Sequence, residues 1–238
     1  NEENKNLLEK NGCEVEIKII STSGDRTQEW NTSFDKLEGK GFFTKELEEE
    51  LLAGTIDLAV HSHKDLPTTG PDGLIVAGVS QREDPSELLL IRKEAVDDTK
   101  KFSLKENSIV GTSSARRKSQ LLAFRPDVEL KDLRGNVPTR IKKLADKEYD
   151  AILLAAAGVA RLELDLDEFH SERLSPYEFV PAPAQGVLAW QIKENNNKLL
   201  DLFDKITDLD VLIKTNLERR VLNLFDGATE VLSVLDGG

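Results

Sequence analysis

The chain has 238 residues, of which 39% are hydrophobic, and a formal net charge of −12 at pH 7. This length allows one large domain or two smaller ones with hydrophobic cores, and the negative charge disfavours nucleic acid and acidic membranes as partners. No apolar run approaches the about 20 residues of a membrane span, no signal-like stretch follows Asn1, and the single cysteine, Cys13, excludes an internal disulfide, so we expect a cytoplasmic protein.

The first part of the chain alternates predicted strands and helices. Glu14 to Ile20 alternates polar and apolar residues, as a half-buried strand does, and Lys45 to Leu52 has leucines at helical spacing. Ile56 to Val60 is a short apolar run, and Leu74 to Val79 and Leu88 to Ile91 are predicted to be further strands. The order strand, helix, strand predicts an α/β domain with a mainly parallel sheet.

The same pattern begins again after residue 107. Ile109 and Val110 form a strand that leads into a helix ending before Pro126. Val128 to Leu133 is predicted to be a strand, Pro138 to Ala145 a helix with proline in its first turn, and Ala151 to Ala157 a buried strand. This second series predicts a second α/β domain.

Two segments are candidates for the crossings between these domains. They are Gln81 to Pro85 and Phe179 to Gln185, the second of which contains two prolines. The crossings place residues 1–80 and 187–205 in domain 1 and residues 86–180 in domain 2. From Lys198 the chain is predicted to be helical, and Asp210 to Leu224 has a further apolar stripe.

One segment reverses the sign of the overall charge, because nine basic and three acidic residues lie between Ala115 and Lys143. Within it, the segment 111–117 (GTSSARR) follows a predicted strand and opens a helix. Backbone N–H groups and the hydroxyls of Thr112, Ser113 and Ser114 there meet the positive end of a helix dipole. The alternative for the hydroxyls is an ordinary helix cap, whereas Arg116 and Arg117 can each bind a carboxylate with two hydrogen bonds.

Arg134 to Arg140 repeats this arrangement at the next turn from strand to helix, with Gly135 allowing close approach of the backbone to a ligand. Ligands of open α/β sheets bind at the carboxyl ends of the strands, where both turns lie. We therefore predict a site for a ligand with many carboxylates. A solvent-exposed basic helix face is the alternative, mainly for Lys142 and Lys143.

The segment His61 to Asp65 follows another predicted strand. His61 and His63 lack a third ligand in a chain with three histidines, so we predict no metal. Asp65 is predicted to act as acid or base in the basic site, and a plain ion pair with Lys64 is the alternative.

Glycines flank Lys40 in a segment that enters the helix at Lys45. We expect this segment, with Lys40 and Lys45, to form a loop that closes over the site, and a flexible connector is the alternative.

These motifs occur together with several others. The set is Thr22-Ser-Gly-Asp25, Gly39-Lys-Gly-Phe42 with Lys45-Glu-Leu-Glu48, His61-Ser-His-Lys-Asp65, Gly111-Thr-Ser-Ser-Ala-Arg-Arg117, Arg134-Gly-Asn136 with Thr139-Arg140, Ala157-Gly158 with Arg161, and Pro183-Ala-Gln-Gly186. In this order they resemble the hydroxymethylbilane synthase family, also called porphobilinogen deaminase. The likeness extends from Ser21 to Gly186 and continues in the Glu218-Arg219 helix.

The resemblance implies an α/β fold of two periplasmic-binding-protein-like domains around a cleft, and a small third α+β domain, of which residues 206–238 are a part. It implies a transferase of porphyrin and heme biosynthesis, a monomer, which condenses four porphobilinogen molecules into a linear tetrapyrrole with loss of ammonia. The chain would grow on a dipyrromethane cofactor bound covalently to a cysteine of the third domain.

The resemblance also implies a role for each matching residue. Asp65 is the expected catalytic residue, and its carboxylate would bind pyrrole N–H groups and offset positive charge. The expected cofactor-binding residues are Lys64, Ser114, Arg116, Arg117, Arg134, Gly135 and Arg140. The expected substrate-binding residues are Thr112, Ser113, Arg161 and Gln185.

The sequence departs from the family in several places. The family's first strand is absent before Asn1, and Phe225 to Thr229 stands where the family has its Gly-Gly-Cys cofactor loop. Cys13 precedes an early strand and is predicted to be a free thiol. Without such a cysteine the chain is expected to lack the covalent cofactor and to be inactive, and a longer protein that supplies this cysteine is the alternative. His63 and Ala184 are smaller departures, where the family has an apolar residue and glycine.

Two other functions compete with this interpretation. A non-enzymatic binding protein for a polycarboxylate solute would explain the arginines but leaves Asp65 without a task. Binding of a nucleotide or nucleic acid through Gly111 to Arg117 is disfavoured by the negative charge and by the presence of only two tryptophans and two tyrosines.

Overall fold

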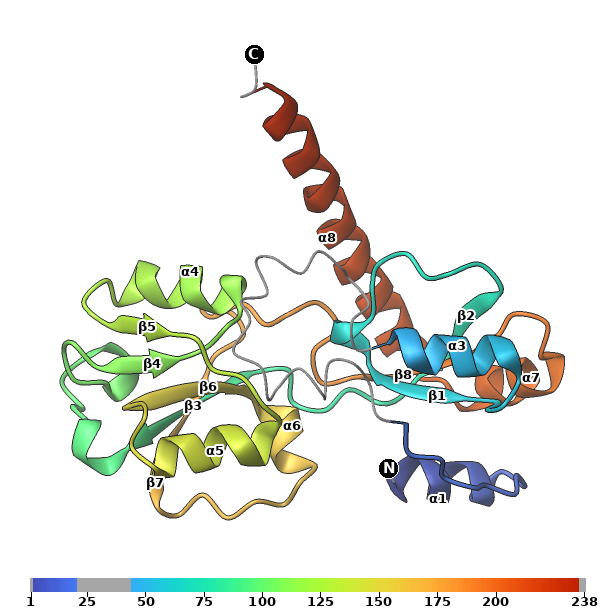
Figure 1. Cartoon of the computed structure of the whole chain (residues 1–238), viewed down its shortest axis with the longest axis horizontal. Helices are drawn as coiled ribbons and strands as arrows, with labels where there is room; N and C mark the ends of the chain where they lie inside the picture. The colour runs from blue at the N-terminus through green and yellow to red at the C-terminus, as the bar shows by residue number, and fades with distance from the viewer. Residues whose placement is uncertain (1, 21–43, 236–238) are drawn as a thin grey trace. The chain divides into compact units, whose positions relative to one another are not determined.

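The computed structural model describes residues 2–20 and 44–235, with side chains as far as Phe225 (Figure 1). The chain divides into two compact units. Unit 1 comprises Asn1–Gln81 and Val187–Gly238, and unit 2 comprises Arg82–Gly186. Residues 206–238 fall within unit 1 in this division, and the small third domain stays a prediction.

The sheet of unit 1 is antiparallel, with the order β1-β8-β2. Its strands are β1 (Ala59–Ser62), β2 (Leu74–Val79) and β8 (Leu188–Lys193). The helices are α1 (Glu2–Lys10), α3 (Lys45–Ala53), α7 (Asn197–Ile206) and α8 (Leu209–Leu235). The central strand β8 is almost entirely buried, because β1 and β2 pair with its two edges and helices pack on its faces.

The main core of unit 1 lies between β8 and helices α1 and α7. Trp190 of β8 stacks on Phe203 of α7, with ring centroids 4.9 Å apart, and its Nε1 donates to Asn4 Oδ1 of α1 at 2.7 Å. Leu8 and Ile192 complete this cluster. An aromatic pair with its one polar atom satisfied therefore joins the consecutive elements β8 and α7 to α1, whose Asn4 lies 186 residues before Trp190.

Unit 2 has a mixed sheet of order β5-β4-β6-β3-β7. Its strands are β3 (Glu87–Arg92), β4 (Ile109–Gly111), β5 (Glu129–Lys131), β6 (Ala151–Ala155) and β7 (Phe169–Leu174). The α-helices are α4 (Ala115–Phe124), α5 (Val137–Ala145) and α6 (Ala156–Ala160). Strand β4 is parallel to β5 and β6, whereas β3 is antiparallel to β6 and β7.

Between its charged ends, Glu87 and Arg92, strand β3 is continuously apolar because both faces of the unit 2 sheet are covered. Leu89 faces the cluster that contains Leu121 of α4, and Leu90 faces the cluster that contains Leu144 of α5. Figure 1 shows α4 and α5 on opposite sides of this sheet. The carboxyl end of β4 leads into α4 and that of β5 leads into α5, so the two predicted arginine turns lie where these helices begin.

The α/β class and most of the predicted elements are confirmed, but some details are wrong. Mainly parallel pairing holds only for β4, β5 and β6 among the described strands. Glu14 to Ile20 forms no strand, since Ile19 is 92% exposed and the segment pairs with no described neighbour. The predicted strand from Ala151 ends at Ala155, where α6 begins. Elements α1, β7 and β8 were not predicted.

No helix in residues 2–20 or 44–235 combines the length and the apolar character needed to cross a membrane. The same described residues contain no group of three or more histidine, cysteine, aspartate or glutamate side chains placed to hold a metal ion.

Candidate functional site

The start of α4 is a capped helix N-terminus. Ser114 Oγ accepts a hydrogen bond from the Arg117 backbone N–H at 3.5 Å, and Thr112 Oγ1 accepts one from the Ser114 N–H at 3.3 Å. Ser113 Oγ donates to Leu133 O at 3.0 Å and accepts from Leu133 N at 3.1 Å, so it ties this turn to the one after β5. The structure therefore gives all three hydroxyls a local role in capping and in joining the two turns.

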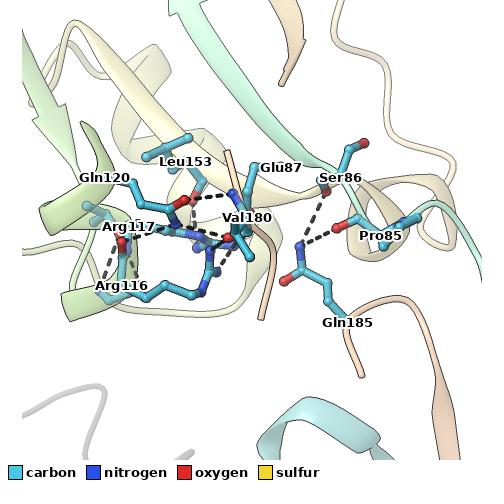
Figure 2. A network of polar contacts seen from close by, with 11 residues as sticks. Pro85, Ser86, Glu87, Arg116, Arg117, Gln120, Leu153, Val180 and Gln185 are labelled. Carbon is cyan, nitrogen blue, oxygen red and sulfur yellow. Dashed lines mark hydrogen bonds and ion pairs between the residues drawn. The ribbon is translucent and has the colours of Figure 1, made fainter. Parts of the chain in front are cut away.

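Arg116 and Arg117 share one buried carboxylate, that of Glu87 at the start of β3 (Figure 2). Arg116 Nη2 pairs with Glu87 Oε1, and Arg117 Nη2 lies 2.6 Å from Glu87 Oε2. The other Nη of Arg117 donates to Leu153 O at 3.1 Å. Sequence reasoning did not consider Glu87. The prediction that both arginines bind ligand carboxylates stays a prediction, and the structure adds that a protein carboxylate already holds both.

The electrostatics of this cluster follow from its burial. Burial alone would raise the pKa of Glu87, but the charges of Arg117 and Arg116 and their hydrogen bonds bring it below its ordinary value. Burial lowers the pKa of Arg116 while Glu87 opposes the shift, and the guanidinium stays charged because arginine titrates above about pH 12. The three groups together carry one net positive charge at neutral pH.

The turn before α5 depends on Gly135. Its φ is +114°, and an added Cβ would lie 2.7 Å from Thr139 Cγ2. Asn136 caps α5 by accepting from the Thr139 N–H at 2.9 Å, and Arg140 Nε donates to Gly135 O at 2.6 Å. Arg134 and Arg140 are both half-buried. Glycine is therefore needed for the backbone path, and Arg140 is placed directly against the turn.

Arg161 and Gln185 both contact the backbone at the ends of unit 2. Arg161 Nη2 donates to Gly186 O at 3.0 Å. Gln185 is fully buried and its Nε2 donates to Pro85 O at 2.8 Å, as Figure 2 shows. Gln185 therefore fastens the two chain segments that enter and leave unit 2, and its role in substrate binding stays a prediction.

Asp65 and Lys64 lie on a short 3₁₀ turn of unit 1, His63–Asp65, directly after β1. The Asp65 side chain is exposed and Lys64 is half-buried. Arg219 of α8 holds this turn, because its Nη1 donates to His63 O at 3.1 Å and to Leu66 O at 2.9 Å. Sequence reasoning noted Arg219 only as part of a family motif and missed this contact.

His61 has a structural partner. Its Nε2 lies 2.9 Å from Gln191 Oε1 across the β1–β8 pair, and Gln191 in turn donates to Glu48 Oε1 at 3.2 Å. Burial lowers the pKa of His61, so the ring is neutral at pH 7. Lys45 at the start of α3 is exposed, with its Nζ 3.8 Å from Glu49 Oε1. Lys40 lies outside the described residues.

The donors of unit 2 fit a ligand that carries several carboxylates. Two buried guanidinium nitrogens, Arg117 Nε and Arg161 Nε, have no hydrogen-bond partner in the described structure, although the Nη atoms of both residues are bonded. The charged nitrogens of arginine are suited to such anions. Cys13 does not fit the task of covalent attachment, because it packs against the apolar cluster around Trp190 in unit 1.

A sequence model described as "Porphobilinogen deaminase, dipyromethane cofactor binding domain" matches residues 1–201. The chain is 44% identical over 238 residues to the porphobilinogen deaminase of Sulfurimonas denitrificans, covering 98% of this chain and 74% of that protein. It is 42% identical over 226 residues to that of Bacillus subtilis, covering 93% and 70%. Among solved structures, the periplasmic VFT2 domain of Bordetella pertussis BvgS has a TM-score of 0.42 and 14% identity over 73% of this chain and 72% of that one.

Proposed function

Because the chain belongs to the porphobilinogen deaminase family, we propose that it acts as a hydroxymethylbilane synthase. This transferase joins four porphobilinogen units into a linear tetrapyrrole for porphyrin and heme biosynthesis. The observation that supports the proposal most strongly is the cluster of arginines at the two joined turns before α4 and α5. Each porphobilinogen carries an acetate and a propionate, so a chain of such units presents many carboxylates to this cluster.

The residues proposed to hold the dipyrromethane cofactor are Lys64, Ser114, Arg116, Arg117, Arg134, Gly135 and Arg140. When bound, this group supplies the pyrrole α-carbon at which chain growth starts. Guanidinium groups would bind its carboxylates, and the Ser114 hydroxyl and the backbone of the Gly135 turn would add hydrogen bonds. Thr112, Ser113, Arg161 and Gln185 are proposed to contact the incoming substrate.

Asp65 is the proposed catalytic residue. When porphobilinogen loses ammonia, the C–N bond of its aminomethyl group breaks and the pyrrole that remains becomes positively charged. A carboxylate beside the ring accepts a hydrogen bond from the pyrrole N–H and stabilises this charge. The exposed Asp65 carboxylate is available for this contact, because the 3₁₀ turn that carries it is held through its backbone.

The proposal includes a monomer in the cytoplasm. It is supported by the single cysteine, which suits a reducing compartment, and by a small-molecule substrate that needs no partner chain.

The test is consumption of porphobilinogen by the holoenzyme and by its Asp65→Asn variant. General acid–base or electrostatic catalysis predicts a loss in kcat of about 10²–10⁴-fold for this variant. Asp57→Asn is the matched control, since Asp57 is also an exposed aspartate of unit 1 and should leave kcat unchanged. A wild-type holoenzyme that binds porphobilinogen without consuming it would favour the binding-protein function. Equal turnover of the two variants would remove Asp65 from catalysis.

A further inference from the structure

Glu87 is the buried acid at the centre of the arginine cluster. It is the first residue of β3, it is fully buried, and each carboxylate oxygen pairs with a different arginine of α4. An ionised carboxylate at such a depth is unfavourable unless it is paired. The pairing with Arg116 and Arg117 meets that need, and it equally compensates two neighbouring guanidiniums that would otherwise repel each other.

The same contacts fix the direction of both guanidinium planes. Arg117 is held on one Nη by Glu87 and on the other by Leu153 O, which leaves its buried Nε without a partner. Arg116 is held by Glu87 and by Val180 O. Figure 2 shows Arg116 and Arg117 together with Glu87 and Val180.

Gln120 secures the second support of Arg116. Its Nε2 donates to Val180 O at 2.9 Å and its Oε1 accepts from Val180 N at 2.7 Å. Val180 is therefore held on both backbone groups, and its carbonyl is a fixed acceptor for Arg116. The orientation of Arg116 then depends on Glu87, which is its one ion-pair partner among the described residues.

We propose that Glu87 is a positioning residue, which orients the guanidiniums of Arg116 and Arg117 so that, besides holding the cofactor, they also bind the carboxylates of the incoming porphobilinogen. This inference rests on the proposed function. Glu87 does not touch the reacting atoms in this scheme, and it acts through the two arginines. Because carboxylate contacts are made equally in the ground state and in the transition state, their loss should appear in KM and spare kcat.

The experiment compares Glu87→Gln with wild type in steady-state kinetics on porphobilinogen. The amide has nearly the shape of the carboxylate, but it offers one acceptor instead of two and directs an N–H group at a guanidinium. We expect KM to rise about 10-fold, the effect of losing one charge-assisted hydrogen bond, while kcat changes less than about 3-fold. Glu178→Gln removes an exposed carboxylate that pairs with Lys101 and should leave both constants unchanged.

A folded Glu87→Gln variant with the wild-type KM, or with kcat reduced at unchanged KM, would overturn the inference. If this variant does not fold, the same kinetic constants are measured for Glu87→Asp, which keeps the charge but has a side chain one methylene too short to reach both arginines. We expect a smaller rise in KM at unchanged kcat, and a wild-type KM would again refute the role. Failure of the wild-type holoenzyme to consume porphobilinogen would instead refute the proposed function itself.

Discussion

Arg219 offers a direct test of how the candidate catalytic turn is held. Its guanidinium on α8 donates to the backbone carbonyls of His63, Leu66 and Pro67, the residues that flank Lys64 and Asp65. Burial lowers the pKa of Arg219, yet an arginine remains charged at neutral pH. Replacement by glutamine leaves a neutral, shorter side chain that can reach one of these carbonyls at most.

The expected loss of stability can be worked from these contacts. A hydrogen bond from a charged donor contributes about 1.5–3 kcal/mol, so two lost bonds would cost about 3–6 kcal/mol if nothing replaced them. Arg219 is only half-buried, so water can reach part of the freed backbone, and the burial cost of the guanidinium is also regained. We therefore expect Arg219→Gln to lower the free energy of unfolding by about 2 kcal/mol.

Urea denaturation measures this change, and Arg220→Gln is the matched control, because Arg220 is the next residue on α8 and is exposed. The control should change the free energy of unfolding by less than about 0.5 kcal/mol. Since the turn carries Asp65, Arg219→Gln should also lower kcat, whereas Arg220→Gln should not. Equal stability and equal turnover of the two variants would refute the assignment of Arg219 as the support of this turn.

Two further predictions concern the free energy of unfolding. Gly186 has a φ of +89°, and an added Cβ would lie 2.4 Å from Glu83 O, so Gly186→Ala should cost about 3 kcal/mol or more in thermal or urea unfolding. Gly12→Ala, at a φ of +83° with open space around it, should cost only about 1 kcal/mol, and equal losses would contradict the steric argument. Hydrogen bonds from Arg125 lower the pKa of Asp127 from 3.8 to about 2, so this carboxylate stabilises the fold above its unfolded pKa and loses that effect as the pH falls toward 2. The Asp127→Asn variant should show a weaker loss of stability over this interval than wild type, and an unchanged pH dependence would argue against the pairing.

Local patterns in the sequence predicted those elements that are stabilised by residues close to them in the sequence. Strand β2 has the predicted bounds Leu74–Val79, and α4 and α5 agree within a residue or two with the predicted helices. Each has a local signal: a cap, a proline in the first turn, or a short apolar run between turn residues. The boundaries therefore follow from residues that are close in sequence.

Elements that depend on distant partners were not predictable in the same way. Strand β8 pairs with β1 about 130 residues earlier, and its mainly apolar segment Leu188–Ile192, interrupted by Gln191, fits a buried helix segment as well as a strand. The opposite error occurred at Glu14 to Ile20, where a regular alternation is present but no neighbouring strand is described. An alternating pattern predicts which face of a strand would be buried, but it does not show whether a neighbouring strand is present to pair with that segment.

The candidate site shows the same division between local and distant information. The sequence placed Arg116 and Arg117 at the start of a helix after a strand, which the structure confirms, and it placed Ser114 as a possible cap, which it is. It could not assign Glu87, which lies about 30 residues earlier and meets the arginines only through the packing of α4 on the sheet. One signal was present, because a glutamate directly before the buried run Leu88–Ile91 must find a cationic partner if it is buried too.

A count of charges along the sequence therefore overestimates how strongly the arginine cluster attracts an anionic ligand. The basic segment from Ala115 to Lys143 is strongly positive by count, but Glu87 enters from another part of the fold and opposes two of its arginines at once. The resulting cluster has one net positive charge for two guanidiniums, and it attracts an anion less strongly than two unopposed arginines would. For an enzyme that must hold a growing polycarboxylate and later release it, directed hydrogen bonds with a moderate net charge suit the task better than a maximum of positive charge. On the proposed role of Glu87, the buried acid determines both where the arginines point and how tightly they would bind a carboxylate.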